Sequence, residues 1–198
     1  YITRRGDLQQ VRKAIFKALE LDMHPIKINV VVINGFNDNE ILDFVELAYN
    51  YPFHIRFIEF MPIGDLFYWK KERMLSCDVI KSRVEQKYEL ITARTIKGNG
   101  PAKYYSINGG QGTVGFISPM SNHFCGECNR IRMTADGRLR ACLYEKTETD
   151  LGAALYSGAS DEELRQLFIN VINRKPARHH MDDGWGVGNQ RKMYQIGG

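Results

Sequence analysis

Three of the four cysteines lie close together in a segment that could bind a metal. Cys125 and Cys128 are separated by two residues, and Cys142 follows fourteen positions later. Thiolates are ligands for zinc and for iron–sulfur clusters, and a pair with this spacing can bind from one tight turn. The Asp136-Gly137 pair between two alternating runs predicts a β-hairpin that returns Cys142 towards the other two. The sequence therefore predicts a metal site with three thiolate ligands.

The identity of a fourth ligand separates two interpretations. A closed structural zinc site needs four ligands, and His123, His179 and His180 are candidates. One interpretation is a zinc site completed by His123 or Cys77. The other is an iron–sulfur cluster with one iron open to a ligand that is not protein. Cys77 follows Ser76 at the predicted start of a helix, far upstream, and we expect it to be a packed thiol.

Positive charge surrounds the cysteines, which predicts an anion in the same place. Four arginines fall within eleven residues: Arg130, Arg132, Arg138 and Arg140. A phosphorylated small molecule suits this local charge better than nucleic acid does, because the net charge of the chain is only +4 and no nucleic-acid-binding module is recognisable. A solvated basic face of a hairpin is the alternative.

The composition is that of an ordinary globular protein in a reducing compartment. The chain has 198 residues, of which 43% are hydrophobic and 25% are charged. No run of apolar residues is long enough to span a membrane, and the first residues lack the apolar core of a signal peptide. Few cysteines, mostly clustered, favour metal binding over disulfides. We therefore expect a cytoplasmic location, or an equivalent reducing compartment, and no membrane partner.

Helix and strand patterns alternate in the first part of the chain, as in βα units with a parallel sheet. Apolar spacing predicts helices over about 7–21, from 41 to about 48, and 76–88, and strands over 26–33 and 54–60. In those strands Lys27, Asn29 and Arg56 are polar. If the strands belong to a barrel, these polar side chains point inward, where each needs a ligand or a partner. The alternative to ligand contact is an ion pair inside the protein, for example with Glu59.

The alternation stops near residue 88, where a second region begins. Short β-like runs punctuated by glycines continue from residue 90 to 143 and predict an antiparallel sheet. Ser160 and Glu163 then form a capping box in front of a final helix. The predicted fold class is therefore α/β, with βα units followed by a region of mainly antiparallel strands and a helix.

Taken together, these residues resemble the GTP 3',8-cyclases, the radical S-adenosylmethionine enzymes of molybdenum cofactor biosynthesis. The resemblance covers the whole chain and rests on four segments: the strand at 27–31 followed by 35–40, the strand at 56–62, the block at 121–132, and the terminal residues 196–198. These segments read KINVV with GFNDNE, RFIEFMP, SNHFCGECNRIR and IGG. The implied architecture is an incomplete TIM-like (βα) barrel, residues 1–87, followed by an iron–sulfur and GTP-binding region with a Gly-Gly tail, residues 88–198.

The resemblance also implies roles for individual residues. Cys125, Cys128 and Cys142 would hold a [4Fe-4S] cluster whose open iron contacts the purine of GTP. The GTP-binding positions would be Lys27, Arg56, Arg130, Ile131 and Arg132. Met61 would contact S-adenosylmethionine, and Gly197 and Gly198 would reach the active site and assist catalysis. Glycine permits such a close approach of the backbone, whereas a frayed terminus is the usual state of final residues.

One element of the family is absent from the sequence. The cysteine triplet with spacings of three and two residues, which holds the cluster that cleaves S-adenosylmethionine, has no match here. Two strands cannot close a barrel of about eight. We therefore expect the chain to be the C-terminal part of such an enzyme, to need the missing N-terminal barrel portion, and to be inactive alone. The implied partners are GTP and S-adenosylmethionine, with a homodimer also allowed.

The complete enzyme would form (8S)-3',8-cyclo-7,8-dihydroguanosine 5'-triphosphate from GTP by radical chemistry. Two alternatives stay open: a zinc-stabilised structural or binding module, and another radical S-adenosylmethionine enzyme with an auxiliary cluster. The latter predicts more cysteines than the three clustered ones found here. A nucleic-acid binder ranks last, and its affinity should fall steeply with salt.

Overall fold

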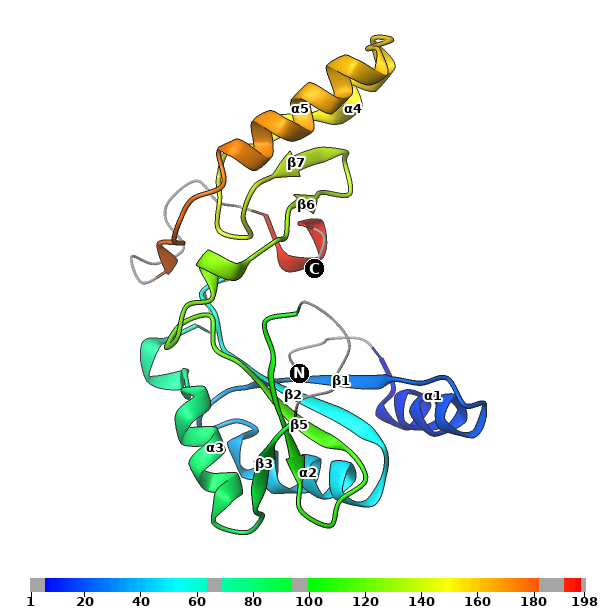
Figure 1. The fold of residues 1–198 in the computed structure, drawn as a ribbon, viewed down its shortest axis with the longest axis vertical. Helices are drawn as coiled ribbons and strands as arrows, with labels where there is room; N and C mark the ends of the chain where they lie inside the picture. Colours follow the sequence, from blue (N-terminus) through cyan, green and yellow to red (C-terminus); the bar gives the residue numbers. More distant parts are fainter. Residues whose placement is uncertain (1–5, 64–68, 94–99, 182–190, 197–198) are drawn as a thin grey trace. The chain divides into compact units, whose positions relative to one another are not determined.

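The computed structural model describes residues 6–63, 69–93, 100–181 and 191–196, and within it the chain forms two compact units (Figure 1). The first unit contains residues 1–58 and 77–117, and the second contains 59–76 and 118–198. This grouping differs from the expected division at residue 88, because the strands that follow that residue join the sheet of the first unit.

A five-stranded sheet organises the first unit. Its strands are β1 (Ile26–Val32), β2 (Phe53–Glu59), β3 (Leu90–Thr92), β4 (Lys103–Ile107) and β5 (Thr113–Ile117), in the order β1-β2-β5-β4-β3. Strand β5 is parallel to β2 and antiparallel to β4, and β4 is antiparallel to β3. The sheet is therefore mixed: the antiparallel pairing expected after residue 90 is present, but it extends the sheet that the earlier strands begin.

Helices of the first unit match the predicted ones closely. They are α1 (Leu8–Glu20), α2 (Ile41–Asn50) and α3 (Cys77–Glu85), with a 3-10 turn η1 (Asp38–Glu40) before α2. Helices α2 and α3 contact each other, and both contact β5. Asp7 caps α1, because its carboxylate accepts a hydrogen bond from the Gln9 amide at 2.8 Å.

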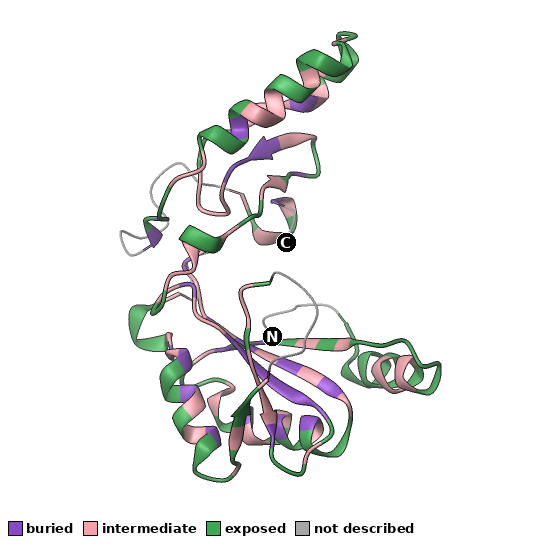
Figure 2. Ribbon diagram, in the orientation of Figure 1, coloured by how far each residue is buried: buried purple, intermediate pink, exposed green. Residues whose placement is uncertain are grey.

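The core of this unit follows from strand alternation. In β2, Phe53, Ile55 and Phe57 are buried, while the intervening His54 and Arg56 are half-buried (Figure 2). Successive side chains of a strand point to opposite faces, so the buried set faces one side of the sheet. Strand β1 alternates as well, but its polar positions are exposed. Burial of the apolar set supplies most of the stability of such a layer.

A small antiparallel sheet and two helices form the second unit. The strands are β6 (Arg132–Met133), β7 (Arg138–Arg140) and β8 (Thr149–Asp150), in that order, and the helices are α4 (Leu151–Tyr156) and α5 (Asp161–Asn173). The 3-10 turns are η2 (Lys71–Arg73), η3 (Cys125–Glu127) and η5 (Met193–Gln195). No helix in the described part of the chain is long and apolar enough to cross a membrane.

The last long helix, α5, begins at the predicted capping box. The Glu163 amide donates to Ser160 Oγ at 3.3 Å, and the Ser160 amide donates to Glu163 Oε2 at 2.7 Å. A core of four buried residues lies between this helix, α4 and β7: Leu139, Ala141, Leu151 and Val171. This core holds the strand that leads to Cys142.

Candidate functional site

The predicted hairpin is present and carries the cysteine region. Strands β6 and β7 are antiparallel, with Arg132 opposite Arg140. The Thr134 amide donates to the Arg138 carbonyl at 2.8 Å, so this bond closes a loop of three residues, 135–137, and Gly137 lies in the left-handed region at φ 75°. A loop of this length commonly ends in such a residue, which explains why glycine follows Asp136. The hairpin returns the chain that leads to Cys142 alongside the chain that leaves Cys128.

The first two cysteines lie on one tight turn, as their spacing predicts. Cys125 begins the 3-10 turn η3, and the Cys128 amide donates to the Cys125 carbonyl at 3.1 Å. Cys125, Cys128 and Cys142 are all free thiols and half-buried. Two of these thiols lie on one turn, and the third lies on the segment that follows β7. Thiols are donors that both zinc and iron–sulfur clusters accept.

Arg132 lies close to some of these thiols. Burial lowers the pKa of Arg132, and the nearby Arg130 lowers it further, whereas the thiolates of Cys142 and Cys128 act in the opposite direction. Arg132 therefore lies within electrostatic reach of two of the three cysteines. Its neighbour Arg130 is exposed. Arg132 thus lies near two thiols and near a second arginine, and this concentration of positive charge favours an anionic ligand there.

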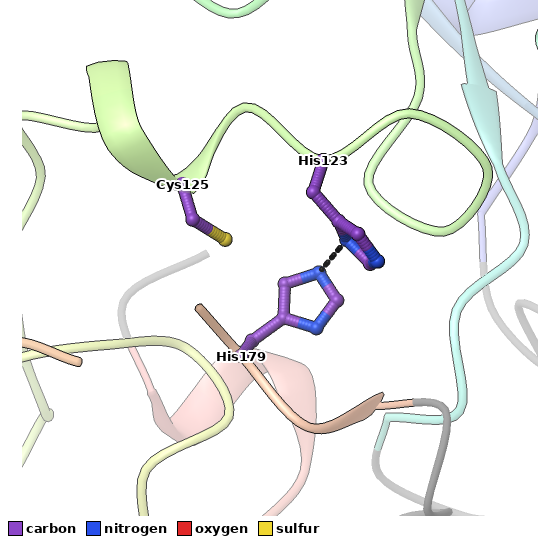
Figure 3. Close-up of side chains that lie close together, drawn as sticks. All are labelled: His123, Cys125 and His179. Atoms are coloured by element: carbon purple, nitrogen blue, oxygen red, sulfur yellow. Dashed lines mark hydrogen bonds between the residues drawn. The ribbon is translucent and has the colours of Figure 1, made fainter. Parts of the chain in front are cut away.

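A second group of candidate ligands lies around Cys125. The ligand atoms of His123, Cys125 and His179 all lie within 4.8 Å of one another (Figure 3). His123 Nδ1 and His179 Nε2 are 2.9 Å apart, and the two rings are edge-on. Two of the histidines considered as a fourth ligand thus lie close to the Cys125 thiol.

Hydrogen bonds already engage the ring nitrogens of this pair. His179 Nε2 lies 2.7 Å from the Pro119 carbonyl oxygen, and the Met181 amide donates to His179 Nδ1 at 3.2 Å. Arg178 donates to His123 Nε2 at 2.8 Å. A metal ion held by this group would have to replace some of these bonds. The two histidines thus form a hydrogen-bonded network beside Cys125.

The remaining predicted site residues lie in different parts of the chain. Lys27 is exposed on β1, and Arg56 is half-buried on β2, both in the first unit. Arg56 Nε is buried and has no hydrogen-bond partner among the described residues. Met61 is half-buried in the second unit. The predicted roles of Gly197 and Gly198 fall outside the described residues.

Two further predictions concern Ile131 and Cys77. The Ile131 side chain is partly buried and packs against the core of the second unit. Cys77 is buried in the first unit, and its thiol lies 3.3 Å from the Ile117 carbonyl oxygen. It is a packed thiol, as expected.

Glu59 supports the loop in front of the cysteine pair, a role that the sequence did not reveal. This fully buried carboxylate accepts hydrogen bonds from the amides of Met120 at 2.8 Å and Ser121 at 2.9 Å, and from the Ser121 hydroxyl. The position of Glu59 could have indicated this role. Every second residue of β2 is buried, and Glu59 is the last residue of that buried set. A charge at such a position needs donors.

Arg191 is a second support that the sequence did not reveal. Its guanidinium donates to both carboxylate oxygens of Asp136 at 2.9 Å, and it forms a 2.6 Å ion pair with Glu148. Hydrogen bonds from Arg191 hold the pKa of Asp136 well below its usual range. The segment 191–196 is thereby fixed to the hairpin loop, and its last described residue, Ile196, is fully buried.

Comparisons with known proteins agree with the resemblance. Three relatives are named GTP 3',8-cyclase. The chain is 67% identical to the one from Syntrophomonas wolfei subsp. wolfei, 46% to the one from Desulforamulus reducens and 48% to the one from Moorella thermoacetica, each over 198 residues. All of this chain is matched, and it spans about three fifths of each relative, 61%, 60% and 60%.

A family model covers much of the same chain. The family described as Molybdenum Cofactor Synthesis C matches residues 53–181, which is more than half of the chain and includes all three clustered cysteines. The chain belongs to the Molybdenum Cofactor Synthesis C family.

Proposed function

We propose that this chain is the GTP-binding, cluster-holding part of a GTP 3',8-cyclase in molybdenum cofactor biosynthesis. The observation that carries the proposal is the hairpin, which returns Cys142 towards the Cys125–Cys128 turn and keeps Arg132 in electrostatic reach of the thiols. The relatives that match the whole chain bear that enzyme's name.

Cys125, Cys128 and Cys142 would hold a [4Fe-4S] cluster. Such a cluster, bound by three thiolates, supplies one iron with an open position, and the purine of GTP is its proposed ligand. The three thiols form no disulfide, as ligands for a cluster require, and they are half-buried. The His123–His179 network lies beside Cys125 and would orient that side of the site.

The cationic residues would bind the triphosphate. Guanidinium groups bind phosphate oxygens through paired hydrogen bonds, and partial burial strengthens such contacts. Arg132 is half-buried and Arg130 exposed, so Arg132 is assigned the larger share of the binding energy. Lys27, Arg56 and the backbone at Ile131 are proposed as further GTP contacts. The unpartnered, buried Nε of Arg56 supports its assignment.

In the complete enzyme, S-adenosylmethionine would contact Met61 and be cleaved at a second [4Fe-4S] cluster. The cysteine triplet for that cluster is not in this sequence. We propose that β1, β2 and their helices belong to a TIM-like barrel completed by residues outside this chain, and that Gly197 and Gly198 assist catalysis. Ring closure between ribose and purine would then give the 3',8-cyclic product. A cytoplasmic location and a homodimer are part of the same proposal.

The test is anaerobic reconstitution of the chain with iron and sulfide, followed by titration with GTP. We expect about four irons per chain, the content of one [4Fe-4S] cluster, and an absorption spectrum that changes with GTP. Arg132→Met should weaken the GTP response more than Arg130→Met. Arg165→Met is the matched control, because Arg165 is exposed and pairs with the exposed Glu162 on α5. A spectrum that GTP leaves unchanged would contradict the proposal.

A structural zinc site is the second candidate, and the His123, Cys125 and His179 group favours it. It predicts one zinc per chain that His179→Ala removes and Cys142→Ser leaves in place. Iron binding that depends on Cys142 and survives His179→Ala would exclude this candidate. Cyclised GTP formed by the chain alone would contradict the proposed need for a second cluster.

A further inference from the structure

Lys175 joins the two chain segments that carry the cysteines. Its ammonium group donates to the Arg130 carbonyl at 2.7 Å and to the Ala141 carbonyl at 3.0 Å. Lys175 lies just beyond the end of α5, and its side chain is half-buried. One segment contains Cys128, two residues before Arg130, and the other continues directly into Cys142. No sequence pattern pointed to this lysine.

The two carbonyls lie where the hairpin ladder has ended. The last residue pair that the strands β6 and β7 form is Arg132 with Arg140. Beyond it, the carbonyl of the buried Ala141 needs another donor, because a buried carbonyl without one is costly, whereas Arg130 is exposed. An ammonium group has three donors, so one lysine can serve both carbonyls. Lys175 thus holds the open end of the hairpin together, as a further pair of residues in the ladder would.

Apolar packing, in contrast, holds the body of this unit. Leu139, Ala141, Leu151 and Val171 are buried together, and the capping box fixes the start of α5. Removing one ammonium group changes neither feature. The effect of losing Lys175 should therefore fall on the two cysteine segments and spare the rest of the unit.

We propose that Lys175 is a positioning residue that sets the separation of Cys128 and Cys142 for cluster binding. The inference rests on the proposed function, since a defined separation of these thiols matters only for a shared ligand. It makes the proposed role of the cysteines depend on a residue whose ammonium group binds two neighbouring backbone carbonyls. A lysine that spans two carbonyls can be replaced by arginine, which also carries several donors, but not by methionine.

The first measurement tests whether Lys175 holds the two cysteine segments in place, and it uses the chain without metal. Amide hydrogen exchange is recorded for the metal-free chain and its Lys175→Met, Lys175→Arg and Arg174→Met variants. The reporters are the Ala141 amide, which donates to Glu145 Oε2 at 2.9 Å, and the Glu145 amide, which donates to the Cys142 carbonyl at 3.2 Å. Arg174 is the matched control, because it is the preceding residue and its side chain donates instead to Thr149 Oγ1 at 2.7 Å.

In Lys175→Met, exchange at Ala141 and Glu145 should be about tenfold faster, the loss expected for one hydrogen bond. Exchange at Val171 in the core should be unchanged, Lys175→Arg should restore protection, and Arg174→Met should match the unmodified chain. Unchanged exchange at both reporters in Lys175→Met would overturn the proposal. Equal loss of protection at Val171 would also overturn it, because Lys175 would then support the fold as a whole.

The second measurement uses the reconstituted chain and follows iron release to a chelator. Lys175→Met should release iron about tenfold faster than the unmodified chain, in proportion to the lost hydrogen bond, while Lys175→Arg and Arg174→Met should not. Equal release rates would overturn the role of Lys175 in cluster binding. If the unmodified chain takes up no cluster, the proposed function fails, and the exchange measurement still decides whether Lys175 holds the two segments.

Discussion

The two units of this chain are stabilised by different forces. The first has a five-stranded sheet whose buried side chains are mostly apolar, such as Phe53 and Phe57. The second has strands of two or three residues, and it buries Arg140 completely beside the network of Asp136, Glu148 and Arg191. Polar contacts of this kind depend on pH and on exact partners, whereas apolar burial does not. We therefore expect the stability of the unit with the candidate site to depend more on pH and on single polar side chains than that of the first unit.

The largest effect is expected from a cavity in the first unit. Phe57 is fully buried and stacks on Phe116 with ring centroids 6.0 Å apart. Phe57→Ala should lower the free energy of unfolding by about 3–5 kcal/mol. Denaturation in urea measures this change in the free energy of unfolding. Phe36→Ala is the matched control, because Phe36 is 57% exposed and should have little effect. Equal losses in both variants would contradict the assignment of the core.

A smaller effect is expected from removing the ionic network in the second unit. Arg191→Met deletes the hydrogen bonds to Asp136 and Glu148, and it should lower Tm by a few degrees. Arg165→Met removes an exposed pair with Glu162 of similar length and should leave Tm unchanged. Differential scanning calorimetry compares the two. If both variants have the same Tm as the unmodified chain, the network does not stabilise this unit.

The smallest effect is a change with pH at Asp136. Hydrogen bonds from Arg191 lower the pKa of this carboxyl, so its stabilising contribution is present above the unfolded-state value of about 3.9 and is lost as the pH falls below it. The Tm difference between the unmodified chain and Asp136→Asn should therefore shrink between pH 7 and about pH 3. Thermal unfolding followed by circular dichroism measures it. A constant difference would show that the carboxylate charge does not contribute.

Local patterns predicted most of the fold. Apolar periodicity gave the helices and strands from α1 to α3, and the capping box at Ser160 gave α5, within a few residues of their bounds. The Asp136-Gly137 pair gave the hairpin, although its loop has three residues. The pairing of β5 with β2 could not be predicted, because a periodic pattern does not state which strand a segment joins.

The candidate site was only partly predictable. Cysteine spacing predicts the proposed ligands, because a chelating turn has a local signature. The supports of the site have none. Glu59 reaches Met120 across 61 residues, Arg191 reaches Asp136 across 55, and Lys175 reaches Ala141 across 34. Lysine, arginine and glutamate are usually surface residues, so their roles here follow only from the fold.

The most direct test of the account compares two cysteine variants. After anaerobic reconstitution of Cys142→Ser and Cys77→Ser, iron and sulfide are counted per chain. We expect Cys77→Ser to keep about four irons, as in the unmodified chain, and Cys142→Ser to lose most of them. Cys77 is a fair control because its thiol is buried in the first unit, away from any ligand role. A full cluster in Cys142→Ser would contradict the claim that the hairpin delivers the third ligand.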